Sequence, residues 1–213
     1  MTELFLGDPQ VLRTTFVLTI ITVLFALSDR RLLMVPVAVQ YVLTSAIAEP
    51  YIGLPLMGIR LIVGLAIAVI IYITAARTER VLSHWRVTRP ERNTAALSSM
   101  GAVFRVLAMA LGALLAIGLW SSDPLPEAPS AVLLCALWLL GIGLSLVLSR
   151  TGPLQIGIGV LVAINGFQIV YLSLESSLLI VALTGLLDLL VALTVAYASD
   201  RWLDAQIEEG ATP

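Results

Sequence analysis

The chain has 213 residues, of which 59% are hydrophobic and only 12% charged, and its mean hydropathy is +1.01. Such a chain cannot form one water-soluble globule, so the composition predicts an all-α, polytopic membrane protein. The net charge of −2 gives no reason to expect a nucleic-acid partner. The single cysteine, Cys135, excludes an intrachain disulfide framework and a cysteine metal site.

The first residues predict that the first apolar run is retained in the mature protein. The start MTELFLGDPQVLR has two acidic residues before its first basic one and no A-x-A-like cleavage site. A secretory signal peptide needs a basic start, so one is not expected here.

Seven apolar stretches are long enough, at about 17 to 25 residues, to cross a bilayer as helices. Polar or proline-containing breaks separate them, and the largest break is a polar loop at residues 76–100. Pro153 suits the first turn of the sixth span, because its missing N–H is not needed there. The expected spans are residues 10–28, 32–48, 53–75, 101–120, 129–149, 153–173 and 176–198 of a single membrane domain, 1–213.

The distribution of arginine predicts the orientation of these spans. With seven spans, nine arginines in the breaks and the C-terminal segment fall on one side, and only Arg13 falls on the other. Because basic residues accumulate on the cytoplasmic side, the N-terminus should be outside and the C-terminus cytoplasmic. The loop 76–100 would then be the largest cytoplasmic feature. The nine are Arg30, Arg31, Arg77, Arg80, Arg86, Arg89, Arg92, Arg150 and Arg201.

Asp188 lies near the middle of the seventh span, in the run SSLLIVALTGLLDLLVALTVAYA. A central Asp opposes insertion by about 2.5–3.5 kcal/mol, but the twelve Leu, Ile and Val residues of this run each favour it by about 0.3–0.6 kcal/mol. The span should therefore insert in spite of the carboxylate. An ionisable residue inside a membrane indicates a buried partner or an ion path.

Other polar residues fall at similar depths when each helical residue is taken to rise about 1.5 Å. Gln40 and Asn165 lie near the centres of the second and sixth spans, level with Asp188, and Gln168 shares a helix face with Asn165. Arg60, in the outer third of the third span, either snorkels outward or pairs with a carboxylate. The amides are candidates for an ion path, or for hydrogen bonds that only hold helices together.

The sixth span is also expected to pack closely against other helices. Its segment IGIGVLVAING contains Gly157, Gly159 and Gly166, and small residues let helix backbones approach each other. The chain contains no cysteine or histidine cluster, no nucleophile–base pair and no phosphate-binding loop. We therefore expect no cofactor, no metal and no catalytic residue on this chain, and whether it belongs to an enzyme stays open.

The C-terminal stretch LLGIGLSLVLSRTGPLQIGIGVLVAINGFQIVYLSLESSLLIVALTGLLDLLVALTVAYASDRW resembles hydrogenase-4 component E, a seven-span subunit of formate-hydrogenlyase-type complexes. This region, residues 129–200, is similar to the three-helix subunit K of complex I and to the corresponding small subunit of multisubunit cation/proton antiporters. Upstream, SDRRLLMVPVAVQYVLTSAIA and GIRLIVGLAIAVIIYITAARTER look like the second and third spans of the family. Arg60 stands where the family tends to have a basic residue, usually Lys.

The resemblance implies a subunit of the prokaryotic inner membrane that contributes to proton or cation translocation. Its partners would be membrane lipid and antiporter-like and other membrane subunits, with iron–sulfur or nickel–iron redox subunits contacted indirectly. The family typically has Glu-Asn-Gly in span six, where this chain has Ile164, Asn165 and Gly166. Asp188 matches the acidic residue typical of span seven, so one carboxylate of an expected pair is present.

Three hypotheses remain open from the sequence. In the first, the chain lines a proton or sodium path in a complex-I-like or group 4 hydrogenase-like assembly, an oxidoreductase to which it adds no redox site. In the second, it is purely architectural, and span six joins antiporter-like subunits without an ion path. In the third, it is a stand-alone permease, although no inverted repeat supports this.

Overall fold

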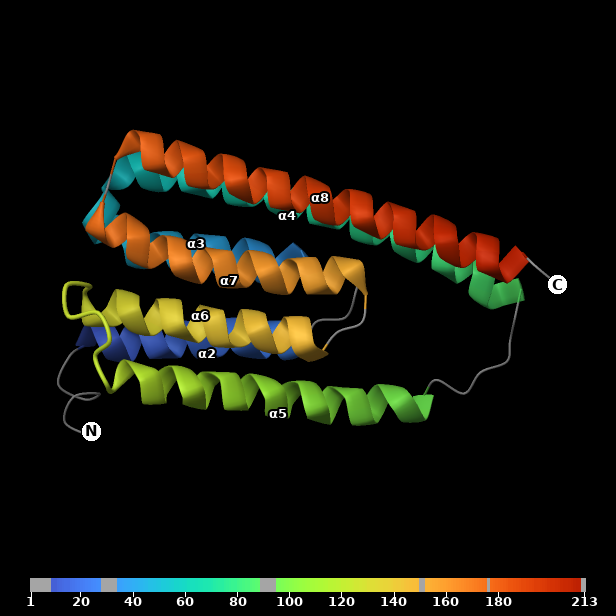
Figure 1. Cartoon of the computed structure of the whole chain (residues 1–213), viewed down its shortest axis with the longest axis horizontal. Coiled ribbons are helices and arrows are strands. Elements are labelled where there is room, and N and C mark those ends of the chain that lie inside the picture. Colours follow the sequence, from blue (N-terminus) through green and yellow to red (C-terminus); the bar gives the residue numbers. More distant parts are fainter. Residues whose placement is uncertain (1–8, 28–33, 89–94, 150–151, 176, 212–213) are drawn as a thin grey trace.

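The computed structural model describes residues 9–27, 34–88, 95–149, 152–175 and 177–211. All regular secondary structure in these ranges is α-helical, which confirms the predicted all-α class (Figure 1). The helices are α2 (Pro9–Leu27), α3 (Met34–Ile52), α4 (Leu54–Thr88), α5 (Ala95–Trp120), α6 (Ser130–Ser149), α7 (Pro153–Leu174) and α8 (Leu178–Ala211).

Four stretches in the described part of the chain are long and apolar enough to cross a membrane: Leu54–Val81, Ser130–Ser149, Pro153–Leu174 and Leu178–Ala205. Shorter apolar helices cover Gln10–Phe25 and Phe104–Trp120. Length and composition therefore support a membrane protein with four candidate spans, fewer than the seven that the apolar runs predict.

Two helices extend beyond the stretches that the apolar pattern outlines. Residues 76–88, expected to belong to a polar loop, continue α4, and α8 continues past residue 198 to Ala211. Polar residues end an apolar run without ending a helix, and neither extension meets a proline before residue 90 or residue 213. At 35 and 34 residues these helices are about 50 Å long, against a hydrocarbon core of about 30 Å.

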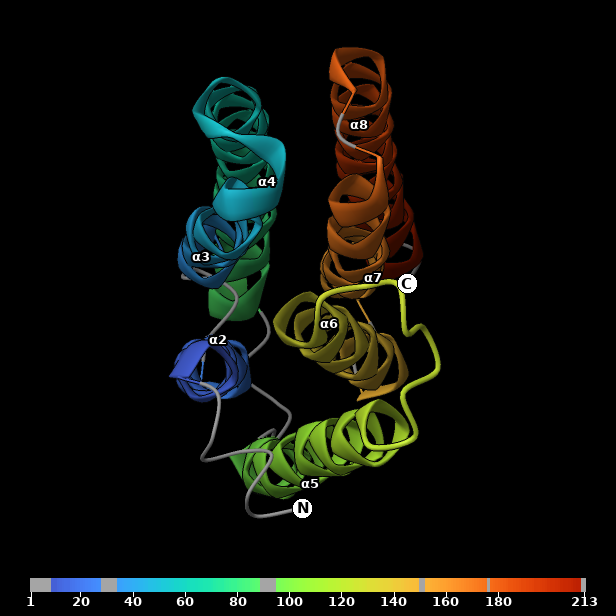
Figure 2. The same cartoon turned by 90° about the vertical axis from the view of Figure 1, so that its left-hand side faces the viewer.

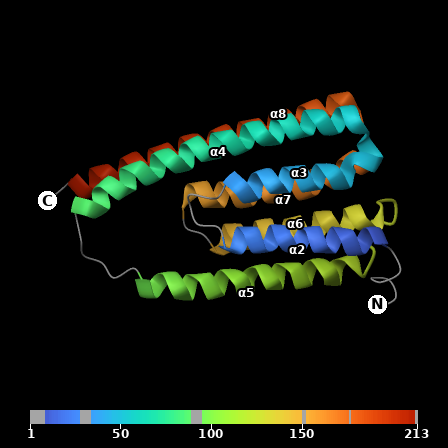
Figure 3. The ribbon, with the colours of Figure 1, turned by 180° about the vertical axis from the view of Figure 1, so that it is seen from behind.

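The ends of α4 and α8 therefore project together past the rest of the bundle (Figure 1). An ion pair joins them there, with Arg77 Nη1 2.9 Å from Asp200 Oδ2. Figure 3 shows the same projection from behind, with α4 in front of α8. Because the side chain of Arg77 is 62% exposed, this pair contributes little stability.

The helices stack in layers, with α4 and α8 in one layer, α3 and α7 in the next, α2 and α6 in the third, and α5 on the outside (Figures 1 and 2). The short connection between α3 and α4 is Gly53, whose positive φ of 76° suits a residue without a Cβ. As expected, Pro153 lies in the first turn of α7. This stacking places α7 in the interior, where neighbours cover both of its sides.

Candidate functional site

A buried polar cluster lies between α3, α4, α7 and α8. Each of these helices contributes two positions that face the same region, at a spacing of three or four residues that puts both on one helix face. They are Tyr41 and Thr44 on α3, Arg60 and Gly64 on α4, Asn165 and Gln168 on α7, and Thr184 and Asp188 on α8.

The carboxylate of Asp188 is 2% exposed and accepts two side-chain hydrogen bonds. The hydroxyl of Tyr41 donates to Oδ2 at 3.1 Å, and Nε2 of Gln168 donates to Oδ1 at 2.7 Å. The same Gln168 nitrogen lies 3.4 Å from the backbone oxygen of Thr184. Helices α3 and α7 thus hold each oxygen of a carboxylate that α8 supplies.

Arg60 forms the second part of the cluster and is itself only 6% exposed. Its Nη2 donates to Oδ1 of Asn165, and Nδ2 of Asn165 lies 3.5 Å from Oγ1 of Thr44. Oγ1 of Thr44 donates in turn to the backbone oxygen of Gln40 at 2.8 Å. The Nε atom of Arg60 is buried and has no hydrogen-bond partner among the described residues.

A cavity of about 10 Å³ is lined by both parts of the cluster, including Tyr41, Arg60, Gln168 and Asp188. A cavity holds a water molecule when its volume reaches about 10–15 Å³ and polar groups line it. Among the described residues, Arg77–Asp200 is an ion pair within 4 Å, whereas Arg60 and Asp188 are not. The two buried charges therefore interact across a water-sized space and through neutral side chains.

The chemistry available to this cluster is proton exchange and ion pairing. A carboxyl group, a phenol and a guanidinium share one enclosed space, and a buried charge is tolerated only where partners compensate for its lost hydration. In the part of the chain that the structure describes, no three His, Cys, Asp or Glu side chains gather as metal ligands do. The arrangement suits a protonatable group held in place by fixed donors.

The structure brings four of the five predicted path residues together: Arg60, Asn165, Gln168 and Asp188. Gln40 is only 1% exposed, but its side-chain Nε2 has no partner among the described residues. One residue along a helix turns the side chain by about 100°. The neighbouring Tyr41, not Gln40, therefore points at Asp188.

Tyr41, Thr44 and Gly64 were not foreseen from the sequence. The signal for the first two was their spacing of three on one face of α3. A Cβ on Gly64 would lie 2.5 Å from Cγ of Tyr41, so this glycine makes room for the phenol ring. The room is visible only when α3 and α4 are packed together.

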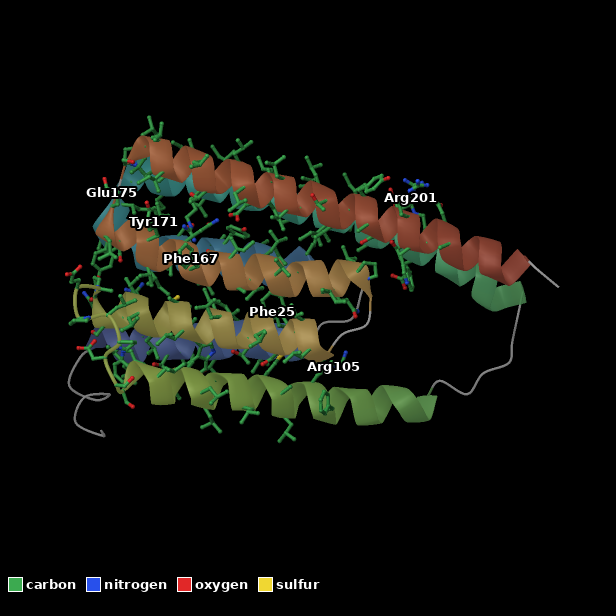
Figure 4. All side chains as sticks on the ribbon, viewed as in Figure 1. Phe25, Arg105, Phe167, Tyr171, Glu175 and Arg201 are labelled. Carbon is green, nitrogen blue, oxygen red and sulfur yellow. The ribbon has the colours of Figure 1, made fainter. Side chains whose placement is uncertain are left out.

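Arg105 is a further arginine inside an apolar run, on α5, and its Nε is buried without a partner among the described residues. Figure 4 places it at the end of the bundle from which α4 and α8 project, away from Asn165 and its neighbours on α7. It therefore belongs to the bundle end and not to the polar cluster.

The three glycines of α7 face helices of the same chain. A Cβ on Gly157 would lie 2.2 Å from Cγ2 of Val195 on α8. A Cβ on Gly159 would lie 2.8 Å from the backbone oxygen of Gly143, and one on Gly166 would lie 2.7 Å from that of Ala136, both on α6. The close approach that these glycines predict is therefore used within the chain.

No protein-family model matches the chain, and comparison with curated proteins and with solved structures also found no match. The geometry of the cluster therefore carries the functional argument.

Proposed function

We propose that the chain is a small integral-membrane subunit of a complex-I-like or group 4 hydrogenase-like energy-converting assembly and that it contributes to proton or cation translocation. All seven helices cross the inner membrane of a prokaryote in this proposal, with the N-terminus outside and the C-terminus cytoplasmic. Asp188 is the group that takes up and releases the proton. The family resemblance of the sequence supports the type of assembly, and the buried cluster supports the role of Asp188.

The observation that carries the proposal is the setting of Asp188. A carboxylate that served only as a helix-to-helix contact would be satisfied by its two neutral donors, Tyr41 and Gln168. Here a water-sized cavity and a buried guanidinium face it as well. Intramembrane carboxylates in such surroundings mark ion pathways, because the membrane makes an unused charge costly.

The outward surfaces of α4 and α8 supply the contact with other subunits or with lipid. Only 28% of the apolar stretch of α4 and 22% of that of α8 is buried within the chain, against 56% for α7. Apolar side chains line the outer face of α8 in Figure 4, among them Leu179, Leu183 and Leu190. In the architectural alternative, α7 was expected to join neighbouring subunits, but its glycines are already covered by α6 and α8.

The test is Asp188→Asn in the assembled complex, with ion translocation into membrane vesicles measured beside the yield of complex. Asn keeps the size of the side chain and cannot exchange a proton, so translocation should fall by about 10²-fold or more, the lower range of general acid–base contributions. The matched control is Asp200→Asn, which makes the same change on α8 at a side chain that is 34% exposed. Full translocation by Asp188→Asn would refute the proposal and favour the architectural reading.

A further inference from the structure

The helices form two three-helix units that repeat the same arrangement in parallel. Unit one is α2–α3–α4 and unit two is α6–α7–α8, and α5 connects them. The lengths correspond, at 19, 19 and 35 residues in unit one and 20, 22 and 34 residues in unit two. Figure 2 shows the units as two adjacent columns, and each helix packs against its counterpart: α2 on α6, α3 on α7 and α4 on α8.

The direction of the chain is also the same in both units. Consecutive helices run antiparallel, so helices that are four elements apart run parallel (Figure 1). This is a parallel repeat, a different symmetry from the inverted repeat that the sequence lacks. In membrane proteins built from parallel repeats, the substrate site lies near the midplane, where the repeats meet.

The polar cluster consists of equivalent positions of the two units. Leu54 and Leu178, the first residues of α4 and α8, are 124 positions apart. The same separation relates four pairs of residues in the cluster: Tyr41 and Asn165, Thr44 and Gln168, Arg60 and Thr184, and Gly64 and Asp188. Each unit therefore contributes the same four positions, and the units differ only in the side chains that occupy them.

Most hydrogen bonds of the cluster cross the seam, by which we mean the surface between the two units. Tyr41 to Asp188 crosses it, as do Arg60 to Asn165 and Asn165 to Thr44. The cation comes from unit one and the carboxylate from unit two. Separation of the units would therefore break the cluster and open Asp188 and Arg60 to water together.

The packing of glycine is tighter within the units than across the seam. Inside a unit, a Cβ on Gly64, Gly143, Gly157 or Gly166 would approach a neighbouring helix to between 2.2 and 2.7 Å. Across the seam, a Cβ on Gly185 would have 3.2 Å to Cγ2 of Val63, which is the nearest glycine contact between the units in the described residues. Two stiff bodies that meet at a less crowded surface can rock against each other as units.

We propose that the seam between unit one and unit two is the gate of the ion path, and that relative movement of the units admits the ion to Asp188. The inference rests on the proposed function, since it assigns the moving part for the same site. In the closed arrangement of Figure 2 the cluster is sealed, and the cavity between its parts holds one water at most. Transport needs a second arrangement in which the seam is wider.

The experiment locks the seam with a disulfide in the full chain within its complex. In a Cys135→Ala background, Val63→Cys and Gly185→Cys place two cysteines across the seam, where the Cβ of Val63 is 3.9 Å from the position of a Cβ on Gly185. This distance falls within the usual disulfide range of about 3.5–4.5 Å. The matched control is Gly157→Cys with Val195→Cys, which joins α7 to α8 inside unit two at a Cβ separation of 2.8 Å.

Oxidation of the seam pair should lower ion translocation about tenfold or more, because the open state can no longer be populated, and reduction should restore it. Oxidation of the control pair should change translocation less than about twofold, because it leaves the seam free. Bond formation is verified by loss of free thiol. Undiminished translocation with the seam pair oxidised would overturn the gate.

A second variant covers the case in which the buried seam pair prevents assembly. Arg77→Cys and Asp200→Cys lie across the same seam on exposed side chains and can be bridged by a short bifunctional thiol reagent. The same loss is expected on bridging, and unchanged translocation would count against the gate. If Asp188→Asn blocks translocation while the bridged chains conduct, the gate is refuted and the proposed function stands. If Asp188→Asn conducts normally, both fail.

Discussion

The contact between α6 and α7 at Gly166 predicts a measurable loss of stability on adding one methyl group. A Cβ on Gly166 would lie 2.7 Å from the backbone oxygen of Ala136 and 3.0 Å from Cβ of Leu139. Ordinary Cβ contacts begin at 3.4 Å, so the first distance is too short by 0.7 Å and the two helices must separate. Overpacking of this kind costs about 1–3 kcal/mol.

A glycine in open space provides the reference. Gly58 on α4 has no atom within 4 Å of an added Cβ, so Gly58→Ala keeps only the gain in helix propensity, about 1 kcal/mol. Gly166→Ala receives the same gain and also bears the clash. It should therefore be less stable than Gly58→Ala by about 1–3 kcal/mol.

The assay is unfolding of the purified protein in mild detergent as the fraction of a denaturing detergent is raised, followed by circular dichroism. The two variants are compared by their transition midpoints under one condition. Equal midpoints, or a higher midpoint for Gly166→Ala, would refute the interpretation of α7 as a helix held by close backbone contact with α6.

Two further predictions concern hydrogen bonds and use the same unfolding assay. Tyr41→Phe removes a donor to Asp188 and should cost about 1.5–3 kcal/mol, and this cost should shrink in an Asp188→Asn background; an equal cost in both backgrounds would exclude the bond. Thr22→Val removes the acceptor of the Trp138 indole N–H at 3.0 Å and should cost about 0.5–1.5 kcal/mol. Thr19→Val is its control, because that exposed hydroxyl bonds only within its own helix, and equal losses would contradict the prediction.

The periodicity of the sequence predicted much of the fold and part of the site. Apolar runs marked where each of the seven helices lies, but they placed the ends of α4 and α8 too early, because a polar run is no barrier to a helix. Helical depth brought Asn165 and Asp188 to one level. The same counting selected Gln40, whose rotation on α3 a depth estimate does not contain.

The sequence by itself determined the solvent, the helical class and the expensive carboxylate, since these follow from composition and from the cost of a charge among apolar residues. Tertiary structure decided which groups answer that charge. Tyr41, 147 positions away along the chain, reaches Asp188 only because the two three-helix units stack in parallel and Gly64 leaves room for its ring. Local sequence carries no record of such a meeting, because it depends on how distant helices pack.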